Sequence, residues 1–211
     1  MPAAHPDPAP AANVDQDPSD LHDVVIVDPV RRRLILAAMC VALVAVVASV
    51  SGLNVAQQAL AEDLGASQSQ LLWIINGYTL ALAALLMPVG AIGDRWGRKP
   101  VLLIGLVAFA ATNIAAAFAT DPTTLIALRV AAGFAAAMVM PVTLSVITST
   151  FPEGERAQAI GIWAGVAGSG GLVGLFVSSF MVDMVNWRWL FVLPAALAVV
   201  SLWLTSRAVP N

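Results

Sequence analysis

The chain is poor in the residues that build most metal and redox sites. It has one cysteine, Cys40, and its two histidines, His5 and His22, both lie close to the N-terminus. A single cysteine cannot form a disulfide within the chain, and no Cys/His cluster with metal-ligand spacing can be assembled. We therefore expect no metal ion, no cofactor and no disulfide framework.

Charged residues are also scarce. They make up 11% of the 211 residues, against 59% hydrophobic residues, and the mean hydropathy is +0.85. This composition excludes an ordinary soluble domain and is typical of a protein whose partner is the lipid bilayer. We expect no nucleic-acid partner and, because the predicted spans hold no histidine or carboxylate, no enzyme activity.

The first 30 residues differ from the rest. Residues 1–30 hold six of the thirteen prolines, six acids and no base, whereas residues 31–211 carry a net charge of +3. The tail has no apolar period that could bury a core, so we predict a disordered, acidic, proline-rich cytoplasmic tail over 1–30. Residues 31–211 form the second predicted domain, which is embedded in the membrane.

Six apolar stretches follow Arg31. Each can supply a helix of roughly 20 residues, enough to cross about 30 Å of hydrocarbon. Hydrocarbon offers backbone groups no outside partner, so segments of this length must be helical. We predict an all-α integral membrane protein with six transmembrane helices, one within each of the apolar stretches 34–61, 64–93, 100–120, 122–152, 157–182 and 189–206.

The basic residues predict the orientation. Eight of them fall on one side of an alternating six-span thread, and only Arg188 falls on the other. Basic residues are enriched in cytoplasmic loops, so we predict that both termini are cytoplasmic. The eight are Arg31, Arg32, Arg33, Arg95, Arg98, Lys99, Arg156 and Arg207.

The loop between the second and third spans reads GAIGDRWGRKP from Gly90 to Pro100. Composition alone would describe it as a basic cytoplasmic turn, in which Gly97 permits a tight reversal. Its full spacing, G-x-x-x-D-R-x-G-R-K, resembles the signature loop of the major facilitator superfamily of transporters. Asp94 can accept hydrogen bonds from backbone donors at a neighbouring helix N-terminus, or it can pair with a nearby arginine, and we predict that this loop acts as a conformational latch. Its residues are Gly90, Asp94, Arg95, Gly97, Arg98 and Lys99.

Other segments resemble the same family in the right order. Leu125 to Gly133 resembles the fourth-helix motif, residues 151–157 resemble the loop before helix five, and residues 187–191 the start of helix six. With Tyr78, the pattern is most similar to the fourteen-helix drug:proton antiporter branch. The resemblance implies the N-terminal half of a plasma (inner) membrane transporter, built from two inverted three-helix repeats. It also implies small-molecule or drug efflux, with protons as the coupling ion.

Arg129 is the one charge inside a predicted span. It could snorkel outward, or it could face a cavity or a polar partner. The resemblance places it, with Gly133 and Tyr78, on the substrate or proton pathway. We expect it to hydrogen-bond carbonyls or polar groups such as Asn54, or an acid supplied by the missing half or the substrate.

Ser51, Asn54 and Gln58 are spaced by three and four residues, which would place them on one helical face. They could line a substrate path, or they could hydrogen-bond neighbouring helices.

Glycines recur along the fifth span. Their spacing, in Gly161-x-x-x-Gly165 and Gly170-x-x-x-Gly174, is typical of helices that pack closely. Two positions depart from the antiporter branch. The branch ends the fifth helix with G-P-x-x-G-G, whereas this chain has Gly174-Leu-Phe-Val-Ser-Ser at the matching position. In the first helix the branch commonly has an acid at the position where this chain has Ser49.

We expect that this half does not transport alone. The interpretation is a truncated or fragmentary transporter that lacks its C-terminal half, and a self-pairing half-transporter is the first alternative. The second alternative is a non-transporting membrane scaffold or sensor that has kept the fold.

Overall fold

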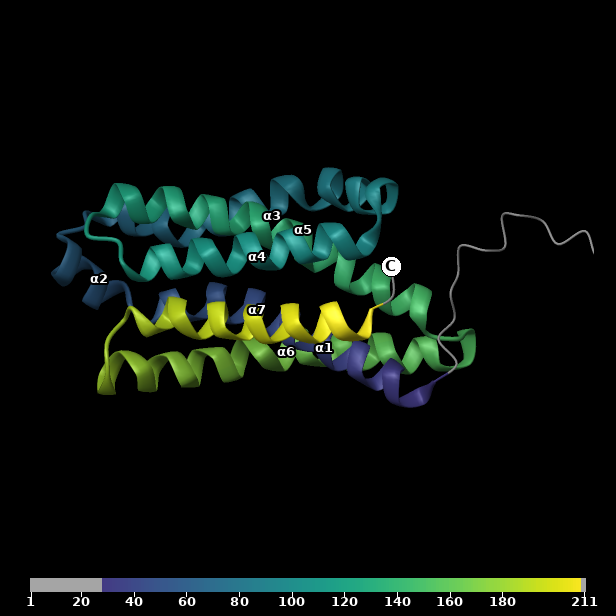
Figure 1. The fold of residues 1–211 in the computed structure, drawn as a ribbon. Helices are drawn as coiled ribbons and strands as arrows, with labels where there is room; N and C mark the ends of the chain where they lie inside the picture. The colour runs from purple at the N-terminus through teal and green to yellow at the C-terminus, as the bar shows by residue number, and fades with distance from the viewer. Residues whose placement is uncertain (1–27, 210–211) are drawn as a thin grey trace, which may run out of the picture.

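The structure, a computed structural model, describes residues 28–209, apart from the side chain of Asp94. The predicted disordered tail therefore lies outside the described residues up to position 27. Over the described range the chain is helical and contains no strand (Figure 1). Its elements are α1 (Pro29–Ser51), a 3-10 turn η2 (Gly52–Asn54), α2 (Gln57–Leu64), α3 (Gln68–Trp96), α4 (Arg98–Ala117), α5 (Pro122–Thr150), α6 (Glu153–Met184) and α7 (Trp189–Ala208).

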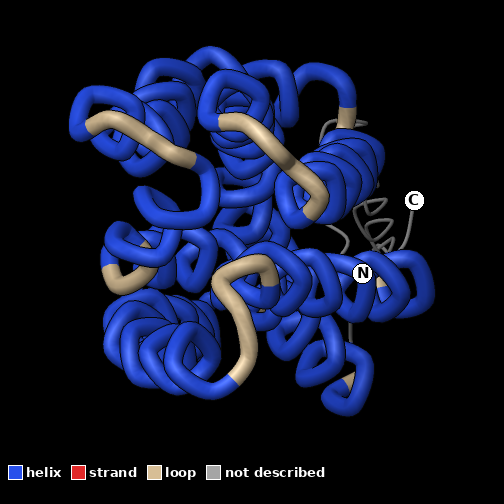
Figure 2. Tube along the Cα trace, turned by 90° about the vertical axis from the view of Figure 1, so that its left-hand side faces the viewer, coloured by secondary structure: helices blue, strands red, loops and turns tan. Residues whose placement is uncertain are grey.

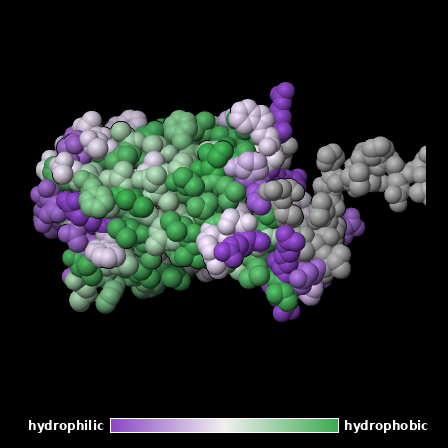
Figure 3. All heavy atoms as spheres, in the orientation of Figure 1, coloured by the Kyte–Doolittle hydropathy of each residue, from purple (hydrophilic) through white to green (hydrophobic). Residues whose placement is uncertain are grey.

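The predicted fold class is confirmed. Six of these helices are long and apolar enough to cross a membrane: α1 with η2, then α3, α4, α5, α6 and α7. Figure 3 shows the apolar surface as a belt in the middle of the molecule, with hydrophilic residues gathered at both ends. This distribution is the one that a bilayer requires, because only the ends of the spans meet water.

Two boundaries differ from those of the sequence pattern. The first apolar stretch runs to residue 61, but its α-helix stops at Ser51 and passes through η2 into the separate short helix α2. The predicted tail also ended too late. The carboxylate of Asp28 accepts a hydrogen bond from the backbone N–H of Val30 at 2.9 Å, so α1 begins at Pro29. An aspartate before a proline at the first helical position is a strong start signal.

Local sequence also sets the other boundaries. Ser67 and Gln70 form a capping box that starts α3, and the carboxylate of Asp121 accepts a hydrogen bond from Thr124 N–H, 2.8 Å away, at the start of α5. That backbone hydrogen bond is the main reason why the pKa of Asp121 lies below its ordinary value. Gly97 separates α3 from α4. Its φ of 98° is a backbone conformation that residues with a Cβ rarely adopt.

The six long helices pack in a pattern that reflects two repeats. α1 packs against α6 and α7, and α5 packs in the same way against α3 and α4. The two groups meet where α4 contacts α7 and where α1 contacts α5. If span one is exchanged with span four, span two with five and span three with six, the same pairs of helices are in contact. The three-helix repeats are therefore interleaved in space. Figure 2 shows the same bundle of helices end-on.

The two ends of the bundle are tied by hydrogen bonds. At one end the Arg31 Nε donates to the Ala208 carbonyl at 2.8 Å, which joins the start of α1 to the end of α7. At the other end Trp187 Nε1 donates to the Asp63 carboxylate at 2.7 Å, and Arg188 donates to the Ala117 carbonyl at 3.1 Å. These contacts hold α2 and α4 against the turn before α7.

Helices α3 and α5 approach each other closely at Gly133. A Cβ built on Gly133 would overlap the Tyr78 carbonyl oxygen and would stand 2.9 Å from the Ala81 Cβ. Backbone occupies one side of this contact, so a side chain there cannot be accommodated by a rotamer change. Gly133 thus sets the distance between the two helices.

We predict that Gly133→Ala destabilises the protein by about 1–3 kcal/mol, because the methyl group overpacks a backbone contact. Thermal unfolding of the protein in detergent, followed by size-exclusion chromatography, measures the effect. Gly161→Ala is the matched control, since a Cβ there would meet nothing within 4 Å. Equal melting temperatures for the two variants would contradict a tight α3–α5 crossing.

Candidate functional site

Arg129 is buried in the interior of the helix bundle. Only 1% of the residue is exposed, although it carries the one full charge in the middle of a span. Its guanidinium donates three hydrogen bonds: Nη1 to Ser49 Oγ at 2.8 Å, Nη2 to the Ser49 carbonyl at 3.1 Å, and Nε to the Ile74 carbonyl at 3.2 Å. One side chain on α5 therefore links α1 and α3.

The network extends into α4 through Asn113. Ser49 Oγ, which accepts from Arg129, donates in turn to Asn113 Oδ1 at 3.3 Å. The Asn113 amide group donates to the Phe109 carbonyl at 2.8 Å, which fixes its orientation on α4. Ser49 and Asn113 are both buried, so each hydrogen bond avoids the cost of an unpaired polar group in the interior.

Tyr78 closes the other side of the guanidinium. The Arg129 Cζ lies 4.2 Å from the centroid of the Tyr78 ring, within the range of a cation–π interaction. The Tyr78 hydroxyl donates to the Val46 carbonyl on α1 at 3.2 Å, and this bond holds the ring in place. The cation is enclosed by a ring face and by oxygen dipoles.

Every acceptor around this cation is neutral. The ion pair between Arg32 and Glu155 does not involve Arg129, whose hydrogen bonds go to Ser49 Oγ and to two backbone carbonyls. The positive charge of Arg129 is therefore stabilised by oriented carbonyl and hydroxyl dipoles and by the face of the Tyr78 ring, in place of a negatively charged side chain. Such a site holds a positive charge without a titrating carboxylate beside it.

The structure decides between the two interpretations of Arg129. The outward, snorkelling side chain was wrong, because the guanidinium lies among α1, α3 and α5. The expected carbonyl partner is present, but Asn54 is not the polar partner. Asn54 is exposed in η2, and its amide donates to the Val50 carbonyl in the preceding helical turn.

The polar face predicted from Ser51, Asn54 and Gln58 was also wrong. The helix breaks after Ser51, so the spacing of three and four residues no longer places these side chains on one face. Their hydrogen bonds are local: Ser51 donates to the Val47 carbonyl, and Gln58 on α2 donates to the Glu62 carboxylate. None of the three contacts Arg129, and none of their hydrogen bonds joins a neighbouring span.

Three of the predicted pathway residues do come together. Tyr78 supplies the ring beside Arg129, and its carbonyl lies against Gly133 one turn further along α5. The sequence analysis did not identify Ser49 and Asn113 as the partners. Asn113 could have been identified, because it is an amide side chain in the otherwise apolar stretch 100–120. Such residues usually form hydrogen bonds to neighbouring helices.

The predicted signature loop is mostly helix. Gly90, Asp94 and Arg95 belong to the last two turns of α3, and Arg98 and Lys99 begin α4. Gly90 lies against Pro141 of α5, where a built Cβ would be 3.6 Å away. The side chain of Asp94 lies outside the described residues, so the latch stays a prediction.

The glycines of α6 divide into two sets. Gly170 and Gly174 are buried against α1, and a Cβ on Gly174 would meet the Ser51 Cβ at 3.4 Å. Gly161 and Gly165 have nothing within 4 Å of a built Cβ among the described residues. Gly161 and Gly165 therefore form an exposed surface of α6 without side chains. No contact among the described residues supports their predicted role in packing.

Residues 37–211 match the family model of the Major Facilitator Superfamily. The chain belongs to that superfamily. Family membership and six apolar helices make it a multi-pass membrane protein.

Curated relatives and solved structures point the same way. The chain is 36% identical over 86% of its length to the methyl viologen resistance protein SmvA of Salmonella typhimurium, and 35% identical over 87% to the multidrug efflux pump LfrA of Mycolicibacterium smegmatis. It spans 37% and 36% of those two proteins. The proton:xylose symporter XylE has the same fold, at a TM-score of 0.74, 14% identity, and coverage of 84% of this chain and 44% of XylE.

We predict that Ser49→Ala destabilises the protein, whereas Ser51→Ala does not. Removing the Ser49 hydroxyl leaves an arginine N–H and the Asn113 carbonyl oxygen without a partner, a loss of about 1–3 kcal/mol. Ser51 is the matched control because its hydroxyl donates only within its own helix. Thermal unfolding in detergent compares the two variants, and a loss of stability in Ser51→Ala as large as in Ser49→Ala would show that the network contributes nothing.

Proposed function

We propose that this chain forms the N-terminal half of a transporter that exports small organic molecules across the plasma membrane. The observation that carries the proposal is the 35–36% identity, across most of the chain, to proteins named for methyl viologen resistance and multidrug efflux. The chain spans little more than a third of those proteins, so the transport cycle requires a C-terminal half or a second copy of this chain.

The exposed faces of α3 and α6 support this need for a partner. Both helices are apolar, yet they are the least buried of the six spans. Met87 on α3 and Phe176 on α6 are 86% and 78% exposed. Lipid can cover such surfaces, but the open glycines on α6 favour a second helix, because they allow a close backbone approach.

For the orientation we propose that both termini are cytoplasmic. The hydrogen bond from Arg31 to the Ala208 carbonyl supports the placement of the start of α1 and the end of α7 on the same side. That side also holds the start of α4 and the start of α6, and with them eight of the nine basic residues outside the spans. The excess of basic residues favours the cytoplasm.

Cysteine labelling tests this orientation. In a Cys40→Ser background, a membrane-impermeant maleimide added to intact cells should label a cysteine at Thr120 and not one at Gly154. Both positions are exposed, and a Cβ at Gly154 meets nothing within 4 Å. Gly97 is unsuitable because its φ of 98° would strain a cysteine. Labelling of Gly154→Cys from outside, with Thr120→Cys protected, would reverse the topology.

We also propose that transport is coupled to protons, and that the coupling carboxylate is not a partner of Arg129. The acceptors of that guanidinium are Ser49, the Ser49 carbonyl and the Ile74 carbonyl, and none of them titrates near neutral pH. Asp94, at the end of α3, is the acid of this half that we assign to the conformational cycle. An acid beside a helix N-terminus stabilises one conformation by about 0.3–2 kcal/mol.

Transport in proteoliposomes tests the function and this assignment together. The intact protein should expel methyl viologen when a pH gradient is imposed, and collapsing the gradient should stop it. Asp94→Asn should lower the initial rate severalfold without lowering the amount of protein in the membrane, since the change removes only a charge. Gln58→Ala is the control, because its side chain contacts only its own short helix.

Each result of that assay has a definite meaning. Wild-type rates in Asp94→Asn would remove Asp94 from the cycle. Export that does not respond to the gradient would refute proton coupling. No movement of methyl viologen or of a panel of dyes by correctly folded protein would favour the scaffold or sensor.

A further inference from the structure

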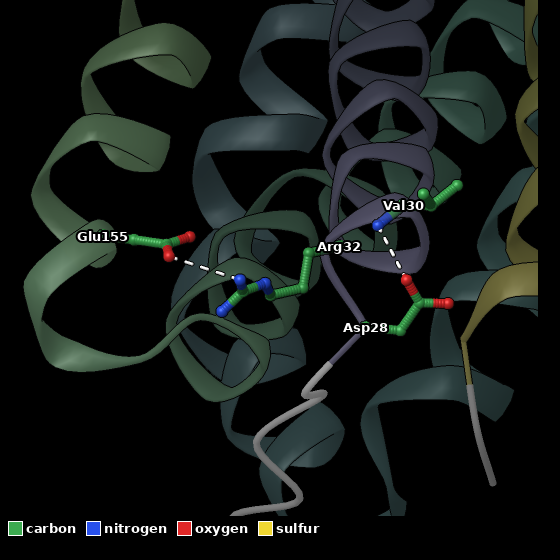
Figure 4. Close-up of polar contacts among 4 residues, drawn as sticks. All are labelled: Asp28, Val30, Arg32 and Glu155. Carbon is green, nitrogen blue, oxygen red and sulfur yellow. Dashed lines mark hydrogen bonds and ion pairs between the residues drawn. The ribbon is translucent and has the colours of Figure 1, made fainter.

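A second polar cluster lies between the first turns of α1 and α6 (Figure 4). The Arg32 Nη2 and Glu155 Oε1 atoms are 3.2 Å apart, and this ion pair borders a cavity of about 410 Å³. We call this space the α1–α6 cavity. Its walls include Arg32, Arg33, Leu36, Phe151, Glu155 and Ile162.

The α1–α6 cavity has an excess of positive charge. Arg32 and Arg33 contribute two guanidinium groups, against the single carboxylate of Glu155. Arg33 has no hydrogen bond or ion pair to any other residue in the range 28–209. The neighbouring Arg31 already donates a hydrogen bond to the Ala208 carbonyl. The donors that remain for a ligand in the cavity are therefore those of Arg32 and Arg33.

Arg32, which lines the cavity, has a donor that no described residue satisfies. Its Nε is buried and has no hydrogen-bond partner among residues 28–209, while only 13% of its side chain is exposed. A buried donor of this kind is costly unless water, an ion or another acceptor satisfies it. An acceptor in the cavity would remove that cost.

The start of α6 lies beside the cavity, since Phe151 and Glu155 are part of the lining. Pro152 precedes the helix and no side chain caps it. The dipole of a long helix favours negative charge near its N-terminus. The cavity therefore lies between two basic side chains of α1 and the N-terminal end of α6.

The remaining walls are apolar. Leu36, Phe151 and Ile162 form part of the lining, and the cavity lies where the first turns of two membrane spans meet the apolar belt. A small hydrated anion would gain nothing from these side chains. A ligand with an anionic head and an apolar body would contact both kinds of wall, and basic pockets between spans at this depth recognise lipid head groups in this way.

We propose that the α1–α6 cavity binds the phosphate group of a phospholipid. Arg32 and Arg33 hold the phosphate oxygens, and the apolar walls contact the glycerol and the upper acyl chain. The site is independent of the proposed transport function, since it requires only the ends of α1 and α6.

Native mass spectrometry of the full chain in detergent tests the site. Phosphatidylglycerol should remain bound, whereas a galactolipid with the same acyl chains should not. Losing two charge-assisted contacts should weaken phosphatidylglycerol binding at least about tenfold in the double variant Arg32→Gln/Arg33→Gln. Arg207→Gln is the matched control, because it removes an arginine at the same end of the bundle that packs on Trp203 instead.

Two further arms keep the result decisive. Glu155→Gln leaves both arginines in place and removes a carboxylate that competes for Arg32, so it should strengthen binding. Equal binding of the galactolipid, equal losses in Arg207→Gln, or weaker binding in Glu155→Gln would each overturn the site. Displacement of the lipid by glycerol 3-phosphate at equal concentration would identify a soluble phosphate as the ligand and overturn the lipid assignment.

Discussion

A buried positive charge without a carboxylate partner is the constraint on which the centre of this structure depends. Burying a guanidinium is costly unless its N–H donors find acceptors. The acceptors of Arg129 are oxygen atoms on two other helices, α1 and α3. Each of those helices must stay at a fixed depth and rotation for the hydrogen bonds to form. The charge therefore fixes the relative positions of α1, α3 and α5, which a purely apolar interface between spans would not do.

The composition of the surrounding helices is consistent with this role. Gly133 allows α3 to approach α5 closely, and Tyr78, which provides the carbonyl at that crossing, also provides the ring beside the cation. The crossing and the polar network share one residue and lie on the same pair of helices. Packing and electrostatics in this half are consequently coupled, and a change in helix spacing would alter both.

Much of the fold could be predicted from the sequence because hydrocarbon imposes a simple rule. Apolar stretches of about 20 residues must form helices, and the charges between them mark the ends. The rule failed where the chain left the membrane. No charged residue occurs between residues 52 and 61, where the backbone turns into η2 and α2, so the charges could not mark the end of α1.

The site was harder to predict because hydrogen-bond partners on different helices have no fixed sequence separation. Arg129 and Tyr78 were identified from a family resemblance, but Ser49 lies 80 positions away from Arg129 and Asn113 lies 64 positions away from Ser49. Local spacing instead suggested Ser51, Asn54 and Gln58, whose side chains bond within their own segments. A helical face can be read from periodicity only while the helix continues.

The ties at the two ends of the bundle restrict how this half can move. Arg31 joins α1 to α7 at one end, and at the other the Trp187 turn is held by Asp63 on α2 and, through Arg188, by the end of α4. Helices fastened at both ends cannot slide along each other by a helical turn without losing those bonds. Prolines interrupt the backbone hydrogen bonds inside three of the helices, at Pro88 in α3, Pro141 in α5 and Pro194 in α7, so bending is easiest at these points. Motion within the bundle should therefore take the form of bending at these prolines and not of one helix sliding along another.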